Sequence, residues 1–147
     1  MLRKDCTALI IQTITEKKIT YQEVSEKIKR SLVWTTLALH GQASMDSTEA
    51  AAAVAVLGLG KDVELALQSY PERGSLEQMP PSDPTHYRFY ELVQTYGTTL
   101  KAIINEKFGD GIMSAIDFTM DIDRVANPNG DRVKITMEGK FLPYKKW

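Results

Sequence analysis

Two charged residues and one serine in the C-terminal half of the chain have types and spacings that could support chemistry. Arg88 and Glu91 are three residues apart, so on a helix they would be neighbours on its surface. This spacing alone predicts an exposed ion pair that contributes roughly a few tenths of a kcal/mol to stability. Ser114 lies where a helical pattern changes to a strand pattern, and serine at such a junction most often caps a helix or stabilises a turn.

The neighbours of Ser114 do not favour a covalent serine mechanism. Gly111-Ile112-Met113-Ser114 is not the G-x-S-x-G elbow, and no histidine–carboxylate pair stands out that could activate the hydroxyl. The chain has only His40, His86 and one distant cysteine as further ligand types, and they do not have the spacing of metal ligands. We therefore expect no metal, and we expect both histidines to lie at helix ends or on the surface.

A long predicted helix carries the charged pair. Asp83 can cap free backbone N–H groups and Pro84 suits the first helical position, so the helix should begin there and run for about seven turns. Apolar residues recur three and four apart and predict one buried stripe, formed by Leu92, Val93, Tyr96, Leu100, Ile103 and Ile104. Arg88 and Glu91 lie off this stripe. Gly97 lowers helix propensity, which predicts close packing against another helix.

From Ser114 onward the pattern changes to alternation and predicts a β-hairpin. Ile116, Phe118, Met120 and Ile122 alternate with polar residues, and a similar strand with Val133, Ile135 and Met137 follows the turn at 127–130. Each strand should have one buried face. One helix and one hairpin form too small a unit to be stable alone. We therefore expect an obligate oligomer in which a partner chain completes the sheet and covers the helix.

The motifs of this region resemble the cyanase family (cyanate hydratase, also called cyanate lyase). The resemblance rests on Tyr87–Glu91 (YRFYE), Tyr96–Ala102 (YGTTLKA), Glu106–Ile112 (EKFGDGI) and the SAI that begins at Ser114, and it covers roughly residues 80–143. It implies that cyanate and the co-substrate bicarbonate give carbamate and carbon dioxide, and that the carbamate breaks down to ammonia and a second carbon dioxide. It also implies a homo-oligomer, a ring-like decamer of five dimers with shared sites, and no organic cofactor.

The resemblance implies that Arg88, Glu91 and Ser114 are the catalytic residues, and their types fit the reaction. Two small anions repel each other, so their encounter needs fixed positive charge in a site from which water is largely excluded. Arg88 can supply this charge through two parallel hydrogen bonds, and Ser114 can donate a further one. Glu91 would orient an arginine, with proton handling as the less favoured role.

The first seventy residues predict an all-α bundle of five short helices. Apolar residues recur at helical spacing over 5–18, and Thr20, Ser31 and Asp46 can each cap a following helix. A fifth helix should span 61–69. A tight connection between the second and third helices gives the outline of a helix-turn-helix.

The fold class is therefore α+β, with an N-terminal all-α bundle and a smaller C-terminal α+β half. Residues 1–70 form the bundle and 71–83 form a linker punctuated by prolines. Residues 84–147 form the catalytic and oligomerisation domain.

The helix-turn-helix outline makes a DNA-binding regulator the rival function. Residues 1–70 contain eight basic and eight acidic side chains, so this half has no net positive charge to meet phosphates. The third helix offers Trp34, Thr35, Thr36 and His40, of which few are usual readers of base edges. We expect no nucleic-acid partner. A catalytically altered relative acting on another small anion is the third possibility.

Composition places the chain among soluble globular proteins. It has 147 residues, of which 43% are hydrophobic, and a net charge of −1. The most apolar run, 50–60, has about half the length needed to cross a bilayer. A single cysteine, Cys6, excludes an internal disulfide and agrees with a reducing compartment. We expect a cytoplasmic protein without a membrane partner.

Overall fold

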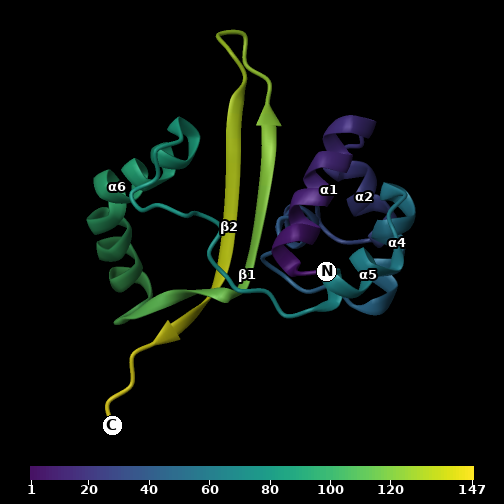
Figure 1. Ribbon diagram of the computed structural model, residues 1–147. Coiled ribbons are helices and arrows are strands. Elements are labelled where there is room, and N and C mark those ends of the chain that lie inside the picture. Colours follow the sequence, from purple (N-terminus) through teal and green to yellow (C-terminus); the bar gives the residue numbers. More distant parts are fainter. The chain divides into compact units, whose positions relative to one another are not determined.

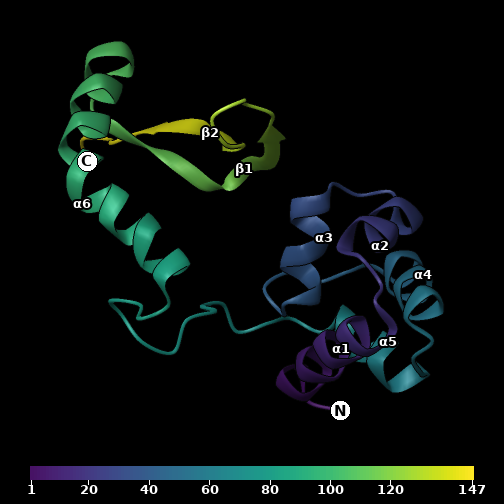
Figure 2. The same cartoon turned by 90° about the horizontal axis from the view of Figure 1, so that it is seen from above.

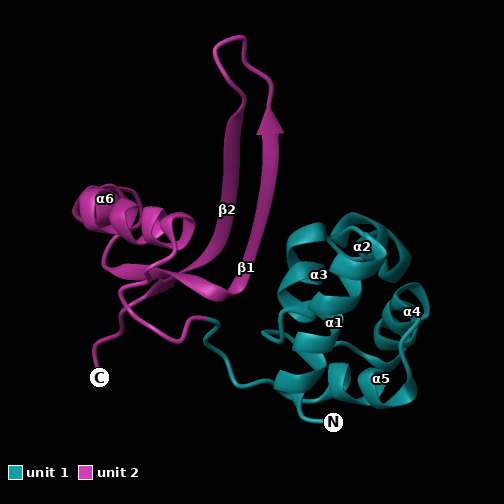
Figure 3. Ribbon diagram, turned by 45° about the horizontal axis from the view of Figure 1, so that its top comes forward, with its two compact units in different colours: residues 1–75 teal, residues 76–147 magenta.

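The patterns of the sequence produce six helices and one antiparallel hairpin, which form two units (Figure 1, Figure 3). The computed structural model describes residues 1–147 and separates into unit 1, Met1–Ser75, and unit 2, Leu76–Trp147. Unit 1 contains α1 (Arg3–Lys17), α2 (Tyr21–Ile28), α3 (Leu32–Leu39), α4 (Ser47–Leu57) and α5 (Lys61–Gln68). Unit 2 contains α6 (Pro84–Phe108), β1 (Gly111–Val125) and β2 (Arg132–Pro143). None of the helices is both long enough and apolar enough to cross a membrane.

Side-chain caps from Thr20, Ser31 and Asp46 mark where α2, α3 and α4 begin, as the sequence predicts. At α2 the Thr20 N–H donates to Glu23 Oε2 at 2.6 Å, and the Glu23 N–H donates to Thr20 Oγ1 at 3.1 Å. The hydrogen bonds from Thr20 lower the pKa of the Glu23 carboxyl. At α4 the Asp46 N–H donates to Glu49 Oε2 at 2.9 Å, and the Glu49 N–H donates to Asp46 Oδ1 at 2.8 Å. Both are capping boxes, which satisfy donors that the helix itself leaves unpaired.

The five helices of unit 1 pack around one apolar core (Figure 2). Every helix contributes side chains that are almost completely buried, and the largest of the fully buried ones include Ile10, Leu39, Leu57, Leu67 and Val24. Ala50 and Ala53 of α4 are also fully buried. Through this alanine-rich stretch α4 packs against α2 and α5.

The Arg3 side chain, in the first turn of α1, donates hydrogen bonds to backbone carbonyls of other elements of the bundle. Its Nη1 donates to the Ala66 carbonyl at 2.7 Å, and its Nη2 donates to the carbonyls of Ala38 and Ala43 at 2.9 and 2.7 Å. Ala38 and Ala66 lie in the last turns of α3 and α5, where carbonyl groups lack the usual i+4 partner. Their carbonyls also accept the N–H groups of Gly41 and Ser69, so Arg3 adds a charged donor to each. One guanidinium therefore joins three elements of unit 1.

Unit 2 consists of α6 and a long hairpin ribbon (Figure 1). Asp83 Oδ1 accepts the N–H groups of Thr85 and His86 at 2.9 and 3.0 Å, and Pro84 occupies the first helical position, as predicted. β1 pairs antiparallel with β2 through partners such as Met120↔Met137 and Ile122↔Ile135. Both strands are longer than the sequence indicates, since β1 already begins at Gly111 and β2 continues to Pro143.

Within a single chain, the predicted apolar stripe of α6 and apolar face of the hairpin are largely exposed, and the sequence predicts that a partner chain covers them. No residue of α6 is buried, and Ile116, Val133 and Val93 are 98%, 76% and 65% exposed. One hairpin cannot cover a 25-residue helix, and Phe108 stacking on Phe141 at 5.3 Å joins the two only near the end of α6. Around Gly97, apart from its chain neighbours and the backbone of its own helix, only Val93 of the same helix comes within 4 Å of the position a Cβ would take. The helix contact predicted there is not made within the chain.

Candidate active site

Arg88 and Glu91 lie together on the exposed face of α6, as their spacing predicts. Arg88 Nη1 donates to Glu91 Oε1 at 3.2 Å, and the two side chains are 70% and 47% exposed. A pair this exposed contributes little to stability. It uses one of the five N–H donors of the guanidinium, so most of the fork that could bind a small oxyanion stays available.

Ser114 lies inside β1, three residues after its start, and not at the helix-to-strand junction that the sequence indicates. The difference arises because Gly111, Ile112 and Met113 already pair with Pro143, Leu142 and Phe141. The serine is 5% exposed. Its Oγ accepts the Ile116 N–H at 3.1 Å and the Asp117 N–H at 2.9 Å, so it stabilises a turn, as serine in this setting often does.

These two hydrogen bonds define what the Ser114 hydroxyl can do. A hydroxyl has two acceptor lone pairs and one donor hydrogen. Both bonds from the backbone use the oxygen as acceptor, which leaves the hydrogen to donate. The arrangement suits a hydrogen-bond donor to an anion, and it provides no base that would make the oxygen a nucleophile.

Within one chain, the three predicted site residues form two separate groups. Arg88 and Glu91 lie in the first third of α6, about 30 and 26 Å along the helix axis from Phe108 by the usual rise of about 1.5 Å per residue. Ser114 follows the other end of the helix. No hydrogen bond or ion pair joins Ser114 to either charged residue. A site that contains all three residues would need the two groups to be brought together.

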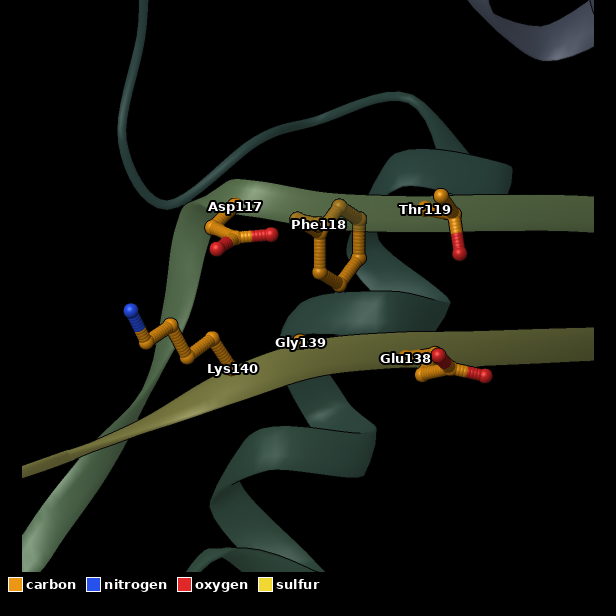
Figure 4. A pocket seen from close by; sticks show the side chains of 6 residues that line it. All are labelled: Asp117, Phe118, Thr119, Glu138, Gly139 and Lys140. Carbon is orange, nitrogen blue, oxygen red and sulfur yellow. The ribbon is translucent and has the colours of Figure 1, made fainter.

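A hollow of about 220 Å³ lies on the hairpin beside the turn at Ser114 (Figure 4). Its lining residues come from both strands and are Asp117, Phe118, Thr119, Glu138, Gly139 and Lys140. Figure 4 shows the Asp117 carboxylate and the Lys140 amine at one end, with the Phe118 ring at the centre. Sequence reasoning missed this feature, although a glycine inside a strand pattern, here Gly139, is a known sign of a bulge or a close backbone approach.

The charged groups at the start of α6 and the histidines have structural partners. The N–H groups of His86 and Thr85 lower the pKa of the Asp83 carboxyl, because they stabilise its charged form. His40 ends α3 as predicted, its Nε2 lies 2.8 Å from the Tyr21 hydroxyl, and burial lowers its pKa. The structure contains no group of three His, Cys, Asp or Glu side chains that could hold a metal ion.

Comparisons with known families cover both units. The family described as "Cyanate lyase C-terminal domain" matches residues 78–146, and the family described as "Cyanate hydratase, N-terminal" matches residues 3–71. The second match extends the resemblance to the helical bundle, for which the sequence motifs give little support.

Individual relatives match the chain over its whole length. Cyanate hydratase of Cupriavidus necator is 51% identical over 147 residues, which is 100% of both chains. Cyanate hydratase of Dechloromonas aromatica is 49% identical over the same 147 residues, again 100% of both chains. The crystal structure of cyanase from T. urticae is similar with a TM-score of 0.80 and 41% identity, over 95% of this chain and 97% of that chain.

Proposed function

The chain belongs to the cyanate hydratase (cyanate lyase) family, and from this membership we propose that it decomposes cyanate with bicarbonate as co-substrate. Cyanate, bicarbonate and one proton give carbamate and carbon dioxide. Carbamate then takes up a second proton and breaks down to ammonia and another carbon dioxide. The observation that carries this proposal is the match to cyanate hydratases over the full length of both chains.

Arg88 is the anion-binding residue in this proposal. Cyanate and bicarbonate are both negative, so their approach needs fixed positive charge that is in place before the reaction. The guanidinium is exposed and makes one hydrogen bond of its own, to Glu91. Its remaining donors can hold bicarbonate, and then the dianionic adduct, through two parallel hydrogen bonds.

Ser114 is the second anion contact in this proposal. Its oxygen already accepts two backbone N–H groups, so its hydrogen is free for a substrate oxygen or for cyanate. Glu91 orients the guanidinium through the 3.2 Å hydrogen bond. This role explains how a carboxylate can lie near bound anions, because the paired Arg88 offsets its charge.

We further propose that the site is built from several chains of a decamer made of five dimers. The apolar side chains of α6 and the hairpin are exposed in one chain, which supports assembly. The separation of Arg88 and Glu91 from Ser114 supports shared sites. We propose no resident metal or organic cofactor and a cytoplasmic location, which fits the free, buried thiol of Cys6.

Ammonia release from cyanate tests the proposed reaction. The purified protein should release ammonia only when bicarbonate is added, and Arg88→Leu should abolish the release while keeping the assembled state. Lys101→Leu, which removes another exposed cation from α6, is the matched control and should stay active. If the wild type releases no ammonia with or without bicarbonate, the proposed function is wrong.

Mixing two impaired variants tests whether sites are shared. Chains carrying Arg88→Ala should be inactive alone, and chains carrying Ser114→Ala should keep only a small residual activity. After they are unfolded together and reassembled, some sites would receive a normal Arg88 from one chain and a normal Ser114 from another, and part of the activity should return. Verified mixed assemblies that are no more active than the separate variants would contradict shared sites.

A further inference from the structure

The turn at Ser114 is part of a large bulge in the hairpin. Met113 pairs with Phe141 and Phe118 pairs with Gly139, so residues 114–117 of β1 lie opposite Lys140 alone on β2. An ordinary bulge places two residues opposite one. Here four do so, and the Ser114 hydroxyl closes the extra loop by accepting the N–H groups of Ile116 and Asp117. The position of the hydroxyl therefore depends on the shape of this bulge.

Gly139 on β2 touches the backbone of the same bulge. A Cβ at this position would lie 2.5 Å from the Ser114 carbonyl oxygen and 2.5 Å from Met113 Cγ. Phe118 Cδ2 would be 3.2 Å away. The methionine side chain can move aside. The carbonyl oxygen cannot move unless Ser114 and the peptide that follows it move as well.

We propose that Gly139 is a positioning residue for Ser114: without a side chain, β2 can lie directly against the Ser114 carbonyl and hold its hydroxyl in the donating orientation. The inference rests on the proposed function, because it concerns the role given there to Ser114. It adds a residue on the opposite strand that touches no substrate. Gly139 acts on the reaction only through the bulge.

Gly139→Ala in the full-length protein tests the proposal by its steady-state kinetics. We expect kcat/KM for cyanate to fall at least tenfold, while light scattering shows the wild-type assembly and circular dichroism shows the wild-type secondary structure. Glu138→Ala is the control on the neighbouring residue of β2 and should change kcat/KM less than twofold. A Gly139→Ala protein with wild-type kcat/KM would overturn the proposal.

A double-substitution cycle separates positioning from a general structural effect. If Gly139 acts through Ser114, adding Gly139→Ala to Ser114→Ala should lower the remaining activity less than twofold. If the glycine only stabilises the hairpin, the two losses multiply, and the proposal is wrong. An inactive wild type would instead contradict the proposed function.

A further pair of variants covers the case in which Gly139→Ala does not assemble. Met113→Ala removes the nearer of the two side-chain neighbours of Gly139 and leaves the Ser114 carbonyl as the main obstacle to a new Cβ. We then expect Met113→Ala/Gly139→Ala to assemble and to be at least tenfold less active than Met113→Ala alone. Equal activity of these two proteins would overturn the proposal.

Discussion

The two units of the chain treat their apolar side chains in opposite ways. In unit 1, Ile10, Leu39 and Leu57 are completely buried among the five helices. In unit 2, no residue of α6 is buried, and Ile116 of the hairpin is 98% exposed. Unit 1 therefore has its own core. Unit 2 has enough apolar side chains to form a core, but within one chain nothing covers them. Since unit 2 carries Arg88, Glu91 and Ser114, we expect catalysis to depend on assembly.

Separating the units gives the largest expected effect. A fragment of residues 1–75 should be a folded monomer that unfolds cooperatively, because its core is complete. A fragment of residues 76–147 should have no folded monomeric form, since its apolar helix face and two-stranded sheet need partners. Light scattering and circular dichroism over a range of concentrations measure both properties. A folded monomer of residues 76–147 would contradict the conclusion that unit 2 needs a partner chain to fold.

Shortening one leucine in each unit should affect two different equilibria. Leu39→Ala should lower the free energy of unfolding of unit 1 by about 3 kcal/mol, because it leaves a cavity in a closed core. Leu100, 55% exposed in one chain, should instead contribute to contacts between chains. Leu100→Ala should therefore raise the concentration at which the assembly dissociates.

Fluorescence can follow these two effects separately. The chain has two tryptophans, Trp34 in unit 1 and Trp147 in unit 2. In a Trp147→Phe background, denaturant unfolding followed by Trp34 reports on unit 1 alone. The change that Leu39→Ala makes in the unfolding of unit 1 should not depend on protein concentration. Dissociation of the Leu100→Ala assembly, followed by light scattering, should depend on it. If the Leu100→Ala assembly dissociates at the same concentration as the wild type, the face of α6 that carries Leu100 does not contribute to the interface.

The local structure of both units could be predicted from sequence because it depends on neighbours in the chain. The capping boxes at Thr20 and Asp46 and the Asp83 cap each join residues at most three positions apart. Such contacts form wherever the chain turns into a helix, whatever surrounds it. The helix positions of Arg88 and Glu91 could be predicted for the same reason.

Burial in unit 2 and the bulge at Ser114 could not be predicted in this way. Periodicity shows which face of α6 is apolar, but it does not show whether the same chain or another one covers that face. The alternation of Ile116, Phe118 and Met120 continues through a shift in strand pairing, so the pattern gives no sign of it. The bulge depends on contact with Gly139, which is 25 residues from Ser114 in sequence.

Removing the Arg3 guanidinium should have the next largest effect on the stability of unit 1. Arg3→Met keeps an apolar stem and leaves the carbonyls of Ala38, Ala43 and Ala66 without this donor. Hydrogen bonds to charged groups contribute more than neutral ones, so we expect unit 1 to lose about 2 kcal/mol of its free energy of unfolding. Lys4→Met, on the exposed side of the same turn, is the control. Equal stability of the two variants would mean that the helix ends do not need Arg3.

The smallest expected effect is a pH dependence of the helix cap at Glu23. The bonds with Thr20 lower the pKa of this carboxyl in the folded state, so the unfolded chain takes up a proton more readily. The stabilisation is fully present above the ordinary pKa of glutamate and is lost as the pH falls through the lowered value. Unit 1 should therefore become less stable in acid, and Glu23→Gln should reduce this dependence on pH.

Denaturant unfolding of unit 1 at several pH values from neutral to acidic measures how steeply its free energy of unfolding changes with pH. Glu26→Gln is the matched control, because it removes a negative charge from the same helix while its carboxylate accepts only the Gln22 side chain, at 2.8 Å. The difference between the two variants isolates the bonds to the backbone from the loss of charge. Asp83→Asn in unit 2 should show the corresponding loss of acid sensitivity only in the assembled protein, because α6 has no stable monomeric form on which its cap could act. Identical slopes for Glu23→Gln and the wild type would show that this cap does not contribute to the stability of unit 1.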